Sequence, residues 1–277
     1  MKKHEAELSR RKFLLESSLM VGAITLCGCS HADSRHGAKE GVIVPNYYTS
    51  KKEELLKDFD GLKRHTRPIL VSNYGDDMAR AMDEDARREF ELLIPQIPYI
   101  GGDDNALTQE IIQSAMALAL YRAMNNQGKT TEETGELLYK TVEAMVDSYP
   151  RLLTRTIGFY EMSGFRQRKT RNAAAESQKR LYPANWAFAF VEGDGEDFDW
   201  GIDYVECGIV KFFHAQGADE LTPYLCLADF PMSEAFGMGL IRTTTIAEGY
   251  DKCNFRFKRG RATQQGWPPA FLDQSKV

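Results

Sequence analysis

The 277-residue sequence has no excess of positive charge, because 35 Lys and Arg face 40 Asp and Glu, a formal net charge of −5. Nucleic-acid-binding domains normally present a basic face, so no nucleic acid partner is expected. Internal repeats and long low-complexity tracts are also absent. With 43% hydrophobic and 27% charged residues, the composition is that of an ordinary folded protein.

Cysteine is scarce, and no Cys-x-x-Cys pair occurs among the five cysteines. Two of them lie near the N-terminus, which leaves Cys207, Cys226 and Cys253, spaced 19 and 27 residues apart. An odd number in an oxidising compartment is compatible with one disulfide and one thiol. A catalytic thiolate and a metal site completed by His214 or Asp229 are the alternatives, and the sequence does not separate them.

The N-terminus has no apolar run long enough to span a membrane. Instead, Ser9-Arg10-Arg11-Lys12-Phe13-Leu14 matches the twin-arginine export motif, and small and apolar residues follow from Leu19 to Leu26. We therefore interpret residues 1–29 as a signal peptide read by the twin-arginine export machinery. The expected location is the periplasm or cell envelope.

The signal ends in a segment that resembles a lipobox, Leu26-Cys27-Gly28-Cys29. It predicts lipidation of Cys29 and membrane attachment through the N-terminal lipid. The alternative is ordinary cleavage near Ala32, which would release a soluble periplasmic protein. The polar residues 30–50 are predicted to be a tether, and 51–277 a single α+β domain.

Hydrophobic periodicity predicts N-terminal helical hairpins packed on a C-terminal antiparallel sheet with short helices. Thr130 and Glu133 form a capping-box pattern at the start of one helix. The predicted helices cover 51–65, 78–94, 108–126, a segment from 130, the stretch 151–180, 208–216 and 220–227, and the predicted strands cover 186–191, 198–205, 240–247 and 253–258.

The helical stretch 151–180 is rich in Arg and Lys. A solvated helix face is the simpler explanation, and contact with anionic lipid headgroups is the alternative for a membrane-tethered protein. The basic residues are Arg166, Arg168, Lys169, Arg171, Lys179 and Arg180.

Groups able to carry chemistry gather between residues 201 and 258. Asp229 follows Cys226 by three residues, so the two side chains would share one face of a helix. Arg242 is a candidate partner for a substrate carboxylate, and Glu248 is a candidate acid or base. Each also has a structural explanation: Arg242 as a surface ion-pair residue, Glu248 as a turn residue, and His214 as a partly exposed structural histidine.

Three motifs carry a family resemblance: E-C-G at 206–208 with G-A-D-E-L-T-P-Y-L-C-L-A-D at 217–229, R-T-T-T-I-A-E-G at 242–249, and C-N-F-R-F at 253–257. They resemble the C-terminal signature of the L-2-amino-thiazoline-4-carboxylic acid hydrolase family, over roughly 108–258. The resemblance implies hydrolytic opening of a cyclic isothiourea to N-carbamoyl-L-cysteine. The family pattern has Asp where this chain has Asn254.

The resemblance implies that water or a thiolate adds to the ring carbon between nitrogen and sulfur. Catalytic candidates are Cys207, Cys226, Cys253, Asp229 and Glu248, and substrate-binding candidates are Arg242, His214 and Asn254. No cofactor is required, although a divalent metal such as zinc could bind the three thiols. The alternative function is a non-catalytic periplasmic lipoprotein that binds a metal or a small ligand.

Overall fold

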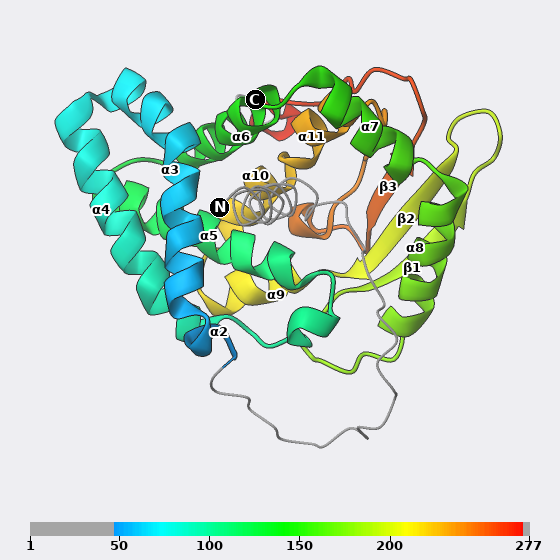
Figure 1. Cartoon of the computed structure of the whole chain (residues 1–277), viewed down its shortest axis with the longest axis horizontal. Helices are drawn as coiled ribbons and strands as arrows, with labels where there is room; N and C mark the ends of the chain where they lie inside the picture. The colour runs from blue at the N-terminus through cyan, green and yellow to red at the C-terminus, as the bar shows by residue number, and fades with distance from the viewer. Residues whose placement is uncertain (1–46, 274–277) are drawn as a thin grey trace, which may run out of the picture.

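A computed structural model describes residues 47–273 and confirms the predicted α+β class (Figure 1). The sheet is antiparallel with strand order β1-β2-β3. It is formed by β1 (Ala187–Glu192), β2 (Trp200–Glu206) and β3 (Cys253–Phe257), close to the predicted ranges. Three of the four predicted strands therefore form one sheet in the C-terminal half.

One face of the sheet is apolar and the other is polar. Strand pairing places Ile202 opposite Phe255 and Tyr204 opposite Cys253, so these four side chains share a face. On the opposite face Asp203 forms ion pairs with Lys252 and Arg256. The apolar face is the one that contributes to the cavity described below.

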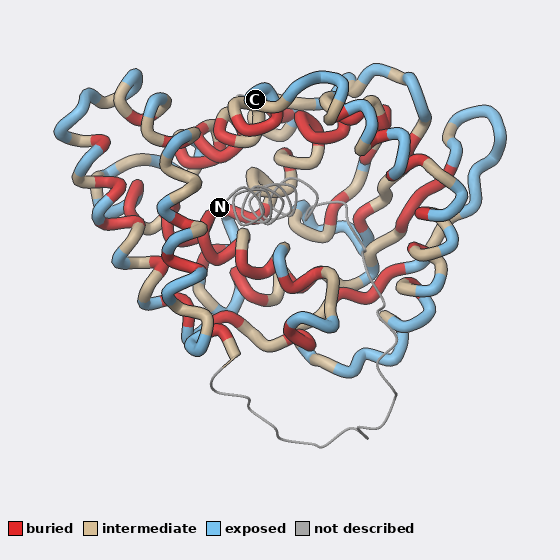
Figure 2. The backbone as a smooth tube through the Cα atoms, in the orientation of Figure 1, coloured by how far each residue is buried: buried red, intermediate tan, exposed pale blue. Residues whose placement is uncertain are grey.

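The N-terminal helices pack around α5 (Thr108–Asn126), which is buried along most of its length (Figure 2). α3 (Lys52–Tyr74) and α4 (Asp76–Leu93) form a hairpin, in which α4 packs on α5. α6 (Thr131–Asp147) follows α5 in the chain and packs on α3. The capping box at Thr130 is present, with the Glu133 N–H donating to Thr130 Oγ1 at 3.1 Å. These helices form the wall that faces the sheet.

The remaining helices join this wall to the sheet. α7 (Arg151–Glu161) and α8 (Gly164–Ser177) come first. α8 packs on β1, and α7 packs on α11 (Asp229–Phe236). Gly158 permits that approach, because a Cβ there would lie 1.8 Å from the Phe236 carbonyl oxygen. The bounds of the others are α9 Gly208–Ala215, α10 Thr222–Cys226 and α12 Ala270–Asp273, with 3₁₀ turns at Ile94–Gln96, Gly102–Asp104, Asp219–Leu221 and Ile246–Glu248.

The prediction of a strand at 240–247 was wrong. Only Ile241 forms a bridge, to Arg256, and the segment then turns into the 3₁₀ helix Ile246–Glu248. Next to these few backbone bonds to β3, a side chain satisfies part of the backbone: Asn254 Oδ1 accepts from the N–H groups of Thr243 and Thr244. Thr and Ile have high strand propensity, but local side-chain hydrogen bonds override it here.

Two further expectations need correction. Within the predicted tether, Tyr47–Ser50 forms the helix α2 and Tyr48 is buried in the core. In the basic stretch, Arg166 is fully buried and forms an ion pair of 2.7 Å with Glu161, so it belongs to no solvated face.

The twin-arginine motif and the lipobox lie outside the described residues. None of the helices between residues 47 and 273 is both long and apolar enough to cross a membrane.

Candidate active site

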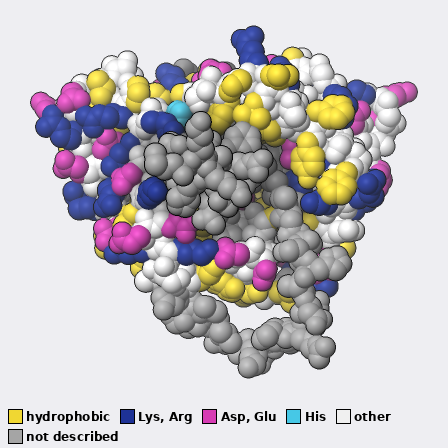
Figure 3. Space-filling model, viewed as in Figure 1, with side chains coloured by type: hydrophobic (Ala, Val, Ile, Leu, Met, Phe, Trp, Pro, Cys, Tyr) yellow, Lys and Arg dark blue, Asp and Glu magenta, His cyan; other side chains and the backbone are white. Residues whose placement is uncertain are grey.

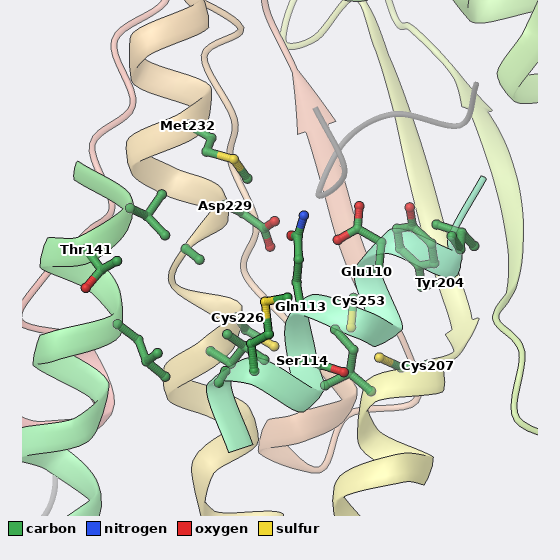
Figure 4. A pocket seen from close by; sticks show the side chains of 18 of the residues that line it. Glu110, Gln113, Ser114, Thr141, Tyr204, Cys207, Cys226, Asp229, Met232 and Cys253 are labelled. Carbon is green, nitrogen blue, oxygen red and sulfur yellow. The ribbon is translucent and has the colours of Figure 1, made fainter. Parts of the chain in front are cut away.

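A cavity of about 200 Å³ lies between the N-terminal helices and the apolar face of the sheet (Figure 4). α5, α6 and α11 line it together with β2 and β3. Its polar lining residues and cysteines are Glu110, Gln113, Ser114, Thr141, Tyr204, Cys207, Cys226, Asp229, Arg242 and Cys253. The other fourteen lining residues are apolar.

Asp229 and Arg242 form a buried ion pair on one wall of the cavity. Asp229 is the first residue of α11, and Arg242 also donates to the Cys226 carbonyl oxygen at 2.8 Å. The guanidinium lies between the rings of Phe230 and Phe255, 4.9 and 5.0 Å from their centroids. Burial raises the pKa of Asp229, and the charge of Arg242 opposes that rise.

This arrangement changes the interpretation of Arg242. Both of its terminal nitrogens already bond to protein oxygens, and its buried Nε has no partner. The side chain is 3% exposed, so it is also no surface ion-pair residue. Arg242 positions and neutralises Asp229, and a substrate carboxylate would have to displace Asp229 to form a bidentate pair with it.

The three cysteines, here called the cavity thiols, meet at the cavity although they come from three segments. Cys207 follows β2, Cys226 ends α10 and Cys253 begins β3, and all three are free. Burial raises the pKa of every one, to about 11 for Cys207. The thiols are therefore protonated near neutral pH, and no disulfide joins them.

The cavity thiols and the side chains around them are not grouped closely enough to make a metal site. Within residues 47–273, no three His, Cys, Asp or Glu side chains are grouped so that they could hold a metal ion. The Sγ of Cys253 instead accepts the Ile246 N–H at 3.2 Å. The geometry gives no support to the predicted zinc site built from these thiols with His214 or Asp229.

Glu110 is a feature of the site that the sequence interpretation missed. It lies in the first turn of α5, near Tyr204 and across the cavity from the apolar wall of α6 (Figure 4). Although part of the residue is accessible, its Oε1 is buried and has no hydrogen-bond partner. Burial, and then the charge of Asp229, raises the pKa of Glu110 well above its ordinary value.

The sequence profile of the L-2-amino-thiazoline-4-carboxylic acid hydrolase family matches residues 109–257, more than half of the chain. The chain belongs to this family. Every polar and sulfur-containing residue of the cavity lies within the matched segment. No curated protein and no solved structure matches the chain.

Three of the site residues proposed from the sequence do not line the cavity. His214 is 79% exposed and bonds to Asp219 on the surface. Glu248 accepts a hydrogen bond from Thr245 Oγ1 at 2.6 Å within the 3₁₀ turn. Asn254 holds the backbone at residues 243 and 244, as described above.

The departure of this member from the family pattern at Asn254 has a structural explanation. Its Oδ1 accepts two backbone N–H groups, a role that an Asp carboxylate performs equally well. Its Nδ2 donates to Thr243 Oγ1 at 2.7 Å, and with Asp the Thr hydroxyl would donate instead. Both residues therefore fit the same backbone arrangement outside the cavity.

Proposed function

We propose that this cavity hydrolyses a cyclic amidine or isothiourea by opening its ring, as in the conversion of L-2-amino-thiazoline-4-carboxylate to N-carbamoyl-L-cysteine. The observation that carries the proposal is Glu110, a buried carboxyl group with an unpartnered oxygen in a cavity whose other carboxylate is neutralised by Arg242. A group of this kind, with a strongly perturbed pKa, is typical of a catalytic acid or base.

The charges of the site favour a cationic head group. Asp229 and Arg242 together are neutral, so Glu110 is the carboxyl group of the cavity that has no cationic partner. An amidinium placed beside Glu110 would lower the pKa of that carboxyl group by direct attraction and convert it to the carboxylate. Binding of the substrate cation thus generates the base at the point where the reaction needs it.

The reaction begins with addition of water to the ring carbon between nitrogen and sulfur. Glu110 takes one proton from the attacking water as the new C–O bond forms. The tetrahedral intermediate then breaks its C–S bond, and the departing sulfur receives the proton held by Glu110. Cleavage of the C–S bond leaves a protonated urea, and loss of its hydroxyl proton to solvent gives the neutral urea beside the free thiol.

Asp229 and the cavity thiols have supporting parts in this scheme. Asp229, held by Arg242, orients the amino group of the substrate from the side of α11. Because burial keeps the thiols protonated, water is assigned as the nucleophile. Cysteine-to-serine variants test this assignment: each should retain thiol release, whereas attack by one cysteine would make that variant inactive.

The direct test is incubation of the protein with L-2-amino-thiazoline-4-carboxylate, with thiol release followed by Ellman's reagent and the product by mass spectrometry. Glu110→Gln should lower kcat by about 10²–10⁴-fold, the usual contribution of a general base. Glu248→Gln, altered outside the cavity, is the matched control and should retain activity. Stoichiometric binding of the ring compound without thiol release would refute the hydrolase and favour the binding-protein alternative.

Export and lipidation are also proposed, on the twin-arginine motif at residues 9–14 and the lipobox ending at Cys29. The protein would act in the periplasm or cell envelope, attached to the membrane through its N-terminal lipid. Mass spectrometry of the mature N-terminal peptide tests this, since the proposal requires an acylated Cys29. An unmodified terminus beyond residue 29 would contradict it.

A further inference from the structure

The cavity extends well beyond the polar groups that the reaction uses. Its lining follows α5 from Glu110, through Gln113 and Ser114, to Ala117 and Leu120. Ten residues of α-helix advance about 15 Å, so the reactive end and the far end are separated by roughly that distance. A five-membered ring beside Glu110 occupies only the first part of this path.

The far part is apolar and has no free polar group to offer. Leu120 on α5 faces Leu138, Val142 and Met145 of α6 across it, with Leu62 of α3 and Leu225 of α10. Thr141 is the polar residue on this side (Figure 4), and its hydroxyl donates to the Leu137 carbonyl oxygen at 2.7 Å. Ser114, at the boundary, likewise donates to the Ile111 carbonyl oxygen at 2.8 Å.

We infer, on the basis of the proposed function, that the substrate is an amphiphile: a cyclic amidine or isothiourea head carrying an uncharged alkyl or aryl tail. The head lies between Glu110 and Asp229, and the tail lies along α5 against α6. Apolar cavities of this kind stay dry and take apolar ligands. Arg242, which is paired with Asp229 at the head, is the only cationic residue that lines the cavity, so no cation lines the apolar part and the tail is neutral.

The test is a series of 2-amino-thiazoline-4-carboxamides bearing N-ethyl, N-butyl and N-hexyl groups, assayed by thiol release. Each added methylene that enters the apolar part should raise kcat/KM about fourfold, until the tail reaches the end of the cavity. The gain should come from KM rather than kcat, because the tail binds equally in the ground and transition states.

A cavity-filling variant locates the tail. Ala117→Leu should remove the dependence on chain length and leave turnover of the tail-free ring compound within a few-fold. Ala175→Leu makes the same change at an exposed position on α8 and should retain the full dependence. Thermal melting of both variants without ligand checks that they are folded.

The outcomes separate this inference from the proposed function. Equal kcat/KM for the tail-free and the hexyl compound would overturn the amphiphile while leaving the hydrolase intact. Length-dependent binding in a thermal-shift assay, abolished by Ala117→Leu but with no thiol released, would support the tail and refute the hydrolase. An equal loss of activity on all compounds in Ala117→Leu would also overturn the placement of the tail.

A second, independent feature is an apolar and basic face formed by α7 and the start of α8 (Figure 3). Leu152, Phe159 and Phe165 are 82%, 66% and 49% exposed on it. Cations lie over two of these side chains: Lys169 Nζ is 4.9 Å from the Phe165 ring centroid, and Arg259 is 5.0 Å from that of Phe159. The only acidic residue between 151 and 171 is Glu161, which is buried.

The geometry points to an anionic bilayer surface as the occupant of this face. Exposed aromatic and aliphatic side chains surrounded by Arg and Lys match the boundary between acyl chains and anionic headgroups. The protein as a whole has a net charge of −5, so this local basic character complements an anionic surface that the rest of the molecule repels. α7 packs on α11 with its other side, so the face lies outside the cavity.

Full-length protein and phosphatidylcholine vesicles, with and without phosphatidylglycerol, test this by co-sedimentation. The triple variant Leu152→Ser, Phe159→Ser and Phe165→Ser should lower the partition coefficient on anionic vesicles at least tenfold. The N-terminus is the same in every protein compared, so the difference reports this face alone.

The matched control changes three hydrophobic residues exposed elsewhere, Leu92, Val205 and Tyr250, to Ser and should bind as the unaltered protein does. Equal binding by the α7–α8 variant and the control would overturn the proposal. Self-association of the protein that the α7–α8 variant abolishes, without any effect on vesicle binding, would overturn it in favour of a second copy.

Discussion

Replacing Glu110 by Gln should make the folded protein less sensitive to rising pH, while abolishing catalysis. The carboxyl group is buried, its Oε1 has no partner, and its pKa is raised well above the ordinary 4.5 by burial and by the charge of Asp229. Gln keeps the size and the neutral state of the protonated carboxyl. The substitution therefore removes the ionisable group and leaves the packing of the side chain nearly unchanged.

The sign and size of the effect follow from proton linkage. Above pH 4.5 the unfolded chain ionises Glu110 while the folded chain keeps its proton, so the folded state binds more protons. Stability contributed by this group is complete below the unfolded pKa and is lost as pH rises towards the folded pKa. One such group gives a slope approaching about 1.4 kcal/mol per pH unit in that interval.

The assay is urea unfolding followed by tryptophan fluorescence, from about pH 5 to about pH 7, for the original protein and Glu110→Gln. The free energy of unfolding of the variant should exceed that of the original protein by an amount that grows with pH. Arg171 lowers the pKa of the exposed Glu192, so Glu192→Gln should give a difference that is constant over this pH range. A Glu110→Gln difference that is flat across this range would refute the buried, protonated carboxyl and with it the proposed base.

Three other predictions concern the surrounding structure. Glu161→Gln removes one charge of the buried pair with Arg166 and should lower the free energy of unfolding by about 3–5 kcal/mol in urea denaturation; a loss below about 1 kcal/mol would contradict the pairing. Asn254→Ala should lower the free energy of unfolding by about 1–3 kcal/mol, because two backbone N–H groups lose their acceptor. Asn254→Asp should change it by less than about 1 kcal/mol and retain thiol release. Urea denaturation and the thiol-release assay test both variants. The cavity thiols should react slowly with iodoacetamide in the native protein and quickly in urea, followed by peptide mass spectrometry; rapid native labelling would contradict their raised pKa values.

Much of the fold was predictable because the hydrophobic periodicity of most segments matches the secondary structure that they adopt. The apolar helix at 108–126 and the alternating strands at 186–191 and 253–258 lie close to where periodicity placed them. The segment 240–247 failed because its side chains and those of Asn254 satisfy backbone groups locally, a choice that propensity does not record. The helix predicted at 51–65 continues to Tyr74 with Pro68 inside it, since tertiary packing outweighs the usual break at proline.

Five of the site residues proposed from the sequence line the cavity, whereas His214, Glu248 and Asn254 lie outside it. Glu110 was not predicted. The cavity thiols, Asp229 and Arg242 meet as expected, but their burial and mutual bonding depend on how β2, α10 and α11 converge. Glu110 was missed because an acidic residue in the first turn of a helix ordinarily complements the helix dipole in solvent. Its signal was that it is the only acidic residue of the helix 108–126 and stands beside Ile111 and Ile112.

The charges of the cavity side chains constrain the chemistry more tightly than the family motifs do. If Arg242 were free, the cavity would attract anions, and a carboxylate on the substrate would be its natural partner. Because Asp229 already occupies that guanidinium, the pair is neutral and Glu110 is the remaining carboxyl group of the cavity. A neutral ligand leaves Glu110 protonated and unable to act as a base, whereas a bound cation ionises it. The same requirement therefore selects the cationic head and generates the base.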